Sequence, residues 1–109
     1  MTHLPDIFAA LSDPTRFAII ERLLDEGELP AGAFQEDFKI SAPAISRHLR
    51  VLNDAGLVHK RVRKQQRLYS ARPDTFEQIG NWAMSHREFW EGSLKRLEAA
   101  LAQETNNDE

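Results

Sequence analysis

Cysteine and long apolar runs are both absent from this chain of 109 residues. Without cysteine there can be no disulfide, thiolate metal site or thiol-based redox sensor. Every apolar run is far shorter than the roughly 20 residues that a membrane-spanning helix requires. The N-terminus also lacks the basic start and apolar stretch of a signal peptide. We therefore expect a cytoplasmic protein without a membrane partner.

Sequence patterns typical of catalysis are missing as well. The five glycines are too dispersed to form a loop that cradles a phosphate, and "HREFWE" does not match the metalloprotease pattern H-E-x-x-H. There is no cysteine nucleophile and no paired-carboxylate signature. We predict that the protein is not an enzyme and requires no cofactor.

Positive charge is concentrated in one part of an otherwise acidic chain. The stretch "KRVRKQQR" at 60–67 holds five basic residues, and residues 41–72 hold eight basic residues and one acid, a net charge of +7. The remaining six basic and sixteen acidic residues bring the total to −3. This separation favours contact with a polyanion through one face. The alternative is a solvated basic hairpin with no partner.

The apolar spacing predicts a mainly α fold with a small β-hairpin. One domain is expected over 1–104, followed by a disordered polar tail at 105–109. In the second helix, Phe17, Ile20, Leu23 and Leu24 form the expected apolar stripe. Two strands joined by "KQQ" follow the fourth helix, as their alternation indicates. The predicted helices are 4–11, 13–26, 30–38, 41–55 and 74–103, and the predicted strands are 57–63 and 67–71.

Two short helices joined by a tight turn and followed by a basic hairpin are typical of a winged helix-turn-helix, which binds double-stranded DNA. In 41–55, Ile45, Leu49 and Leu52 lie on one side, and the opposite side is small and basic. We expect major-groove contacts from this helix and backbone or minor-groove contacts from the hairpin, the wing. The predicted helix residues are Ser41, Pro43, Ser46, Arg47 and Arg50, and those of the wing are Arg61, Arg63, Lys64 and Arg67. A winged-helix protein-interaction module is the alternative, but its recognition face would be apolar.

Three segments, "LSDPTRFAIIERLL", "SAPAISRHLRVLNDAGLV" and "RLYS", resemble the ArsR/SmtB family of bacterial winged-helix repressors. The resemblance covers about residues 4–101. It implies a homodimer built on the first and last helices, which binds an operator and represses nearby genes. The expected dimer residues are Ile7, Phe8, Leu11, Trp82, Phe89, Trp90, Leu94, Leu97 and Leu101.

The chain departs from the family pattern at several positions. Lys39 and Lys64 stand where family members often have glycine, at a left-handed helix end and at the wing tip. Pro30 and Gly32 replace the thiols of one family metal site, and His86 is the only histidine in the last helix, where the other site needs two. We expect no metal at either family site. A sensor gated by an effector, or by a metal held by histidines and carboxylates elsewhere, stays an alternative.

Two groups of residues permit two interpretations each. His48 resembles the family histidine, which braces the helix or touches a DNA phosphate, and it could equally be a half-buried packing residue. Trp82, Phe89 and Trp90 have the helical spacing of core or dimer packing, although they could also line an effector pocket. The sequence does not identify a small-molecule effector.

Overall fold

The computed structural model describes residues 3–107 and the side chains up to Thr105. It is mainly helical with a small antiparallel sheet, which confirms the predicted fold class. The predicted domain over 1–104 spans both of the compact units into which the chain divides between Gln78 and Ile79. The elements are α1 Leu4–Leu11, α2 Pro14–Glu26, β1 Leu29–Pro30, α3 Ala31–Phe38, α4 Ala42–Asp54, β2 Val58–Arg63, β3 Gln66–Ala71, α5 Pro73–Ser85 and α6 Arg87–Asn107.

Helix α2 begins and ends where its capping residues predict. The Asp13 carboxylate accepts a hydrogen bond from the Arg16 N–H at 3.0 Å, and Pro14 occupies the first helical position. Gly27 follows the last turn with φ 81°, a conformation that disfavours any residue with a Cβ. These capping residues fix the length of the helix.

The buried face of α2 differs from the predicted stripe. Ile19, Ile20 and Leu23 are buried, whereas Phe17 and Leu24 are 51% and 52% exposed. Phe17 and Leu24 are seven residues apart and therefore lie on the same side of the helix, away from the buried centre between Ile19 and Leu23. The predicted stripe is therefore only half buried: Ile20 and Leu23 pack in the core, and Phe17 and Leu24 remain exposed.

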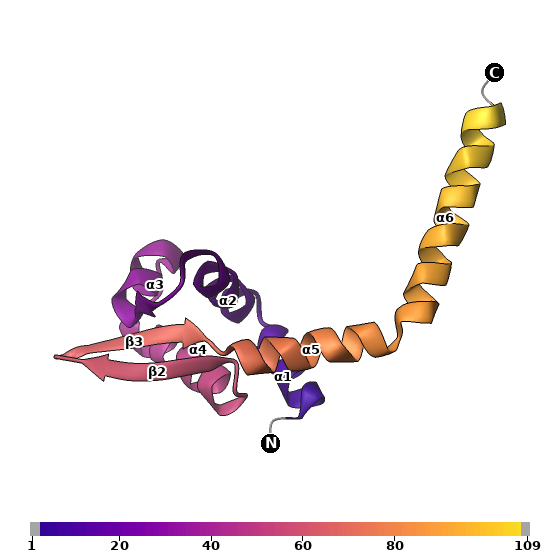
Figure 1. Ribbon diagram of the computed structural model, residues 1–109. Helices are drawn as coiled ribbons and strands as arrows, with labels where there is room; N and C mark the ends of the chain where they lie inside the picture. Colours follow the sequence, from indigo (N-terminus) through magenta and orange to yellow (C-terminus); the bar gives the residue numbers. More distant parts are fainter. Residues whose placement is uncertain (1–2, 108–109) are drawn as a thin grey trace. The chain divides into compact units, whose positions relative to one another are not determined.

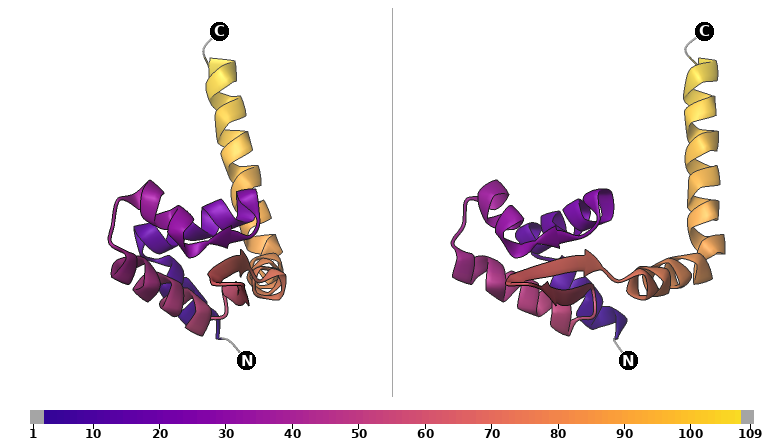
Figure 2. Two further views of the ribbon diagram at one scale, coloured as in Figure 1. Left: turned by 90° about the vertical axis from the view of Figure 1, so that its left-hand side faces the viewer. Right: turned by 60° about the vertical axis from the view of Figure 1, so that its left-hand side comes forward.

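Helices α3 and α4 form the predicted helix-turn-helix. Lys39 ends α3 in the left-handed conformation, with φ 53° and ψ 38°, and its N–H donates to the Gln35 carbonyl. This is the conformation that the family's glycine at this position implied. Phe34 of α3 is fully buried, and Leu49 and Leu52 of α4 are at most 1% exposed. Figures 1 and 2 show the short connection that joins the two helices.

The sheet has three antiparallel strands in the order β1-β3-β2. Strand β1 was not predicted, because two residues are too few to show alternation. Strands β2 and β3 form the predicted hairpin, which runs beside α4 and extends past the helices (Figure 1). Arg63 pairs with Gln66, so the loop contains only Lys64 and Gln65, and the predicted "KQQ" connection is one residue too long.

The prediction of one helix over 74–103 is wrong, because His86 separates α5 from α6. Side chains satisfy the last carbonyls of α5: the Ser85 hydroxyl donates to Trp82, and Trp90 Nε1 donates to Ala83 at 3.2 Å. Such bonds replace those of a continuous helix. Helix α6 then runs to Asn107, so 105–107 are helical rather than part of a tail, and 108–109 lie outside the described residues. No helix between residues 3 and 107 is both long and apolar enough to cross a membrane.

Candidate nucleic-acid interface

Helix α4 presents a polar and basic face to solvent. All five residues that the sequence assigned to the major groove are exposed: Ser41, Pro43, Ser46, Arg47 and Arg50. The buried Ile45, Leu49 and Leu52 hold the opposite side against the core. Ser41 also caps α4, since its hydroxyl oxygen accepts from the Ala44 N–H at 3.3 Å, which leaves the hydroxyl proton to donate elsewhere.

The wing places its basic residues on two opposite faces. Lys60 pairs with Tyr69 and Val62 with Arg67, so Lys60 and Arg67 share one face. Arg61 and Arg63 alternate with them along β2 and therefore lie on the other face. The sequence had grouped Arg61, Arg63, Lys64 and Arg67 as one wing cluster. The structure brings Arg67 to the α4 side and leaves Arg61 and Arg63 away from it.

A small hollow joins α4 to the wing. Its volume is about 120 Å³, and its polar lining comes from Ser46, Arg50 and Asn53 of α4 and from Lys60, Arg67 and Tyr69 of the wing. Among the described residues, Arg50, Lys60 and Arg67 have no ion-pair partner, and no acid lines the hollow. Helix α4 and the wing therefore both contribute unneutralised positive charge to this hollow.

Arg61 differs from the other wing cations because it is held in an ion pair. Its Nε and a terminal nitrogen each donate to a Glu28 carboxylate oxygen at 2.6 Å. These bonds lower the pKa of Glu28, and the carboxylate raises the pKa of Arg61. A depressed carboxyl pKa means that the pair stabilises the fold above the unfolded pKa of Glu28 and loses this effect as the pH falls through the folded pKa. Arg61 therefore ties the wing to the corner before β1.

His48 is half-buried and points toward α2 rather than to the exposed face of α4. Its Nδ1 lies 3.9 Å from a carboxylate oxygen of Asp13, the residue that caps α2. The pKa of Asp13 is lowered, chiefly because it accepts the Arg16 N–H, with smaller contributions from the charges of Arg16 and His48. This position fits the interpretation in which His48 braces α4 against the start of α2.

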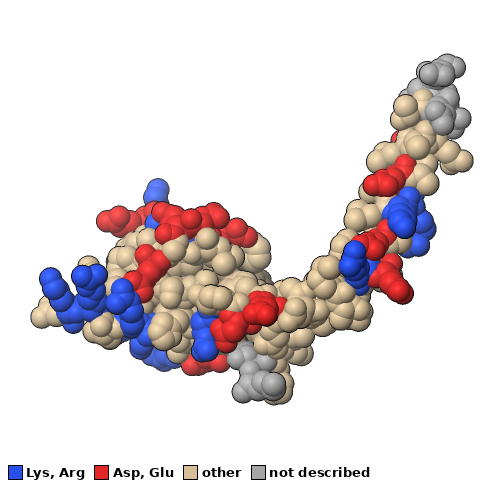
Figure 3. Space-filling model, in the orientation of Figure 1, with Lys and Arg blue, Asp and Glu red and all other residues tan. Residues whose placement is uncertain are grey.

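Charge is separated within the first compact unit as it is in the sequence. Figure 3 shows Lys and Arg side chains gathered around the wing, with Asp and Glu along the side formed by α2 and α3. Residues 21–37 contain six acids and only one basic residue, Arg22. Arg22 is neutralised locally by ion pairs with Glu26 and Asp37. An approaching polyanion is therefore attracted to one side and repelled from the other.

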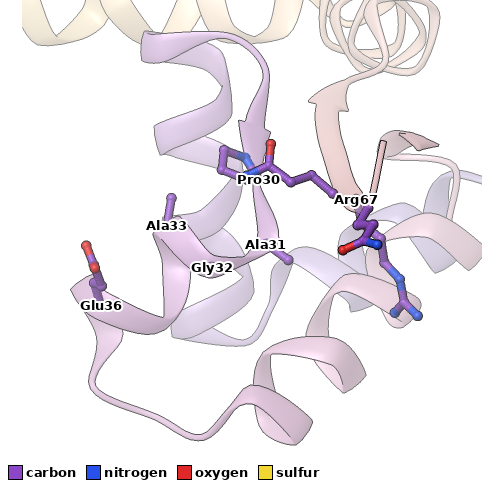
Figure 4. A pocket seen from close by; sticks show the side chains of 8 residues that line it. Pro30, Ala31, Gly32, Ala33, Glu36 and Arg67 are labelled. Atoms are coloured by element: carbon purple, nitrogen blue, oxygen red, sulfur yellow. The ribbon is translucent and has the colours of Figure 1, made fainter. Parts of the chain in front are cut away.

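A second, wider hollow lies between α3 and the wing where the resemblance places metal-binding thiols. It measures about 620 Å³ and includes Pro30 and Gly32, the two residues at the thiol positions. Figure 4 shows Pro30 and Ala31 on the α3 side of this hollow and Arg67 on the wing side, with the Arg67 guanidinium turned away from Pro30 and Ala31. Within residues 3–105, no three His, Cys, Asp or Glu side chains are grouped so that they could hold a metal ion.

The predicted dimer residues divide into buried and exposed groups. Ile7 is fully buried in the core of the first unit and cannot form part of an outer surface, and Leu11 is half-buried. The remaining residues are exposed: Phe8, Trp82, Phe89, Trp90, Leu94, Leu97 and Leu101. Trp82, Phe89 and Trp90 also surround an apolar hollow of about 490 Å³ together with Ala83 and His86.

Lys60 and Asn53 line the α4–wing hollow but were not among the predicted site residues. The strand alternation could have identified Lys60, had the hairpin loop been assigned two residues instead of three. With the longer loop, Arg61, Arg63 and Arg67 fall on one face, because a slip of one residue reverses the side of every residue in the strand. Asn53 carries no charge and has no pattern that would distinguish it from an ordinary surface residue.

The chain is similar to known transcriptional regulators over most of its length. Residues 11–61 match a helix-turn-helix domain family. The transcriptional repressor SdpR of Bacillus subtilis (strain 168) is 36% identical over 80 residues, which cover 73% of this chain and 88% of that protein. The fold resembles the crystal structure of an ArsR family transcriptional regulator, with a TM-score of 0.73 and 28% identity over 81% of this chain and 96% of the other.

A second solved structure, of a possible transcriptional regulator for arsenical resistance, is 34% identical, with a TM-score of 0.68. The match covers 89% of this chain and 96% of the chain in that structure. A helix-turn-helix with a basic wing and relatives of this kind define a DNA-binding transcriptional regulator, not an enzyme. The chain belongs to the ArsR/SmtB family of winged-helix regulators, as the sequence motifs predicted.

Proposed function

We propose that the protein is a dimeric repressor that binds an imperfect inverted-repeat operator, with α4 in the major groove and the wing against the adjacent backbone. The observation that carries this proposal is the exposed basic face of α4 beside a wing with unneutralised cations. Such a helix can read base edges, and the wing can bind phosphates. Because its target would be chromosomal DNA, we infer that the protein acts in the cytoplasm.

Arg47 is the residue best placed to read a base. It is exposed on the side of α4 opposite Ile45 and Leu49, in the first half of the helix, where recognition helices contact base edges. It forms no ion pair within the described chain, so its guanidinium can make two hydrogen bonds to guanine O6 and N7. Pro43 and Ser46, on the neighbouring turns, are small and allow the helix to approach the groove closely.

Selection of bound fragments from a random duplex pool, followed by affinity measurement, tests this function. The wild-type protein should enrich an inverted repeat with half-sites about 10 base pairs apart or a multiple of that spacing. Arg47→Ala should lose roughly 1–3 kcal/mol on that operator and much less on scrambled DNA. Lys95→Ala is the control, since Lys95 is exposed on α6 and lies on a different side of the helix from its apolar row. Equal losses on both duplexes would contradict base reading by Arg47.

The dimer rests on the second compact unit. Helix α6 has 21 residues, and none of residues 87–105, whose side chains are described, is buried within its own chain. Its apolar residues Trp90, Leu94, Leu97 and Leu101 are spaced four, three and four residues apart, which places them in one row. A helix of this kind gains stability by burying that row against another apolar surface. A second copy of the chain supplies a matching row by symmetry.

A further inference from the structure

The α4–wing hollow brings together three cations from two elements, and none of them forms an ion pair among the described residues. By contrast, the nearby wing cation Arg61 is paired with Glu28. Arg50, Lys60 and Arg67 instead converge from two elements on a space that no acid lines. Like charges held close together destabilise a fold unless an anion lies between them. The hollow therefore favours an anionic partner from outside the chain.

The size of the hollow restricts what that partner can be. Sites that enclose small-molecule ligands measure roughly 300–1,000 Å³, whereas this hollow measures about 120 Å³. It accommodates a single small group, such as one phosphate of a longer chain. Arg forms paired hydrogen bonds to phosphate and Lys acts as a point charge. The neutral side chains of Ser46, Asn53 and Tyr69 in the lining can donate further hydrogen bonds.

The position of the hollow along α4 favours the DNA backbone over a base edge. Of the polar α4 residues that line the hollow, Arg50 and Asn53 lie in the second half of the helix, beyond Arg47, and Ser46 lies just before Arg47. Recognition helices contact bases mainly through their N-terminal residues, while groups farther along face the sugar–phosphate backbone. A backbone phosphate that enters between α4 and the wing would contact both elements and fix the angle at which they meet the duplex.

We propose that the α4–wing hollow binds one phosphate of the DNA backbone. Lys60 contacts this phosphate directly, together with Arg50 and Arg67. This inference rests on the proposed function, and it moves Arg50 from base reading to phosphate binding. It also assigns this phosphate contact to the middle of the wing, and not to Arg63 and Lys64 at its tip.

The test compares Lys60→Gln with Arg61→Gln in the full-length protein, using a mixed-sequence duplex and the selected operator at several salt concentrations. Lys60→Gln should weaken binding to both duplexes by the same factor. It should also reduce the slope of log affinity against log salt by about 0.9, the value for one lost phosphate contact. Lys60→Arg should retain the wild-type slope. Arg61→Gln, in which Glu28 loses its partner, should retain that slope too.

Three results would overturn the inference. An unchanged slope for Lys60→Gln would show that Lys60 binds no phosphate, and a loss confined to the operator would make it a base contact. If Arg61→Gln reduced the slope by the same amount, the salt dependence would reflect the total charge of the wing and not a phosphate held in the hollow. Each of these leaves specific binding by the wild-type protein intact, so the proposed function would stand. If the wild-type protein bound neither duplex, both would be rejected. Thermal melting of each variant verifies that its fold is retained.

Discussion

Lys39 and Lys64 hold left-handed backbone conformations, with φ values of 53° and 58°. In this region the Cβ of an L-residue crowds the following carbonyl, which costs roughly 1–2 kcal/mol. Both positions are structurally fixed, because Lys39 closes α3 and Lys64 begins the two-residue loop of the wing. The family resemblance pointed to these two positions from the sequence, since glycine is frequent there. The basic side chains are therefore retained at a cost to stability.

Replacing Lys39 with glycine should stabilise the protein by roughly 0.5–1 kcal/mol, because relief of the left-handed strain exceeds the loss from a more flexible unfolded chain. Lys39→Ala is the matched control: it removes the same charge but keeps the Cβ, and should give no gain. Denaturant unfolding measures both. Equal stabilities for the two variants would show that the strain is not responsible.

At the scale of elements, α4 was the most predictable part of the molecule. Its cap Ser41 and its buried Ile45, Leu49 and Leu52 all lie within one short segment of the sequence, so the pattern defines the helix and its exposed face without tertiary information. The wing register was less predictable. Its loop is Lys64-Gln65 rather than a pair containing Asn or Gly, the residues that normally mark a two-residue hairpin. The error of one residue then assigned Arg67 to the wrong face.

The interruption between α5 and α6 could not be read from the sequence at all. The apolar row continues through His86, and no proline or glycine marks the end of α5. The interruption depends on side-chain bonds from Ser85 and Trp90 to carbonyls of the last turn. Neither residue type is a recognised helix stop. The two bonds are local, since their partners are three and seven residues apart, but the apolar periodicity contains no sign of them and therefore predicts one long helix.

The cap of α2 links this helix to α4 through His48. Asp13→Ala should cost about 1 kcal/mol, because the Arg16 N–H loses its acceptor, whereas Asp13→Asn keeps an acceptor and should cost much less. The pKa of Asp13 is lowered in the folded protein, so its charge stabilises the fold above the unfolded pKa, and this effect is lost as the pH falls through the folded pKa.

Thermal unfolding of the three proteins between neutral and acidic pH measures both effects. The gap between wild type and Asp13→Ala should narrow at acidic pH. A gap that is constant with pH would show that the carboxylate charge contributes nothing and that only the hydrogen bond matters.

At the scale of the whole molecule, the proposed dimer depends on the apolar row of α6, which lies in the second compact unit. Leu97→Asp places a charge in the apolar row of α6 and should raise the dimer dissociation constant at least tenfold, which is about 1.4 kcal/mol. Lys95→Asp introduces the same side chain two residues away, on a different side of α6, and should leave the dimer unchanged. Sedimentation at several concentrations distinguishes the variants. A wild-type protein that stays monomeric at micromolar concentration would reject the dimer itself.

The strand order β1-β3-β2 leaves β2 at the edge of the sheet, where its outer backbone groups have no strand partner among the described residues. Exposed edges of this kind promote aggregation between molecules, and proteins protect them with charged side chains, Lys above all. Lys60, Arg61 and Arg63 supply that protection here. The basic wing is thus also a solubility device. A regulator that lost these charges would risk pairing its edge strand with that of a neighbouring molecule.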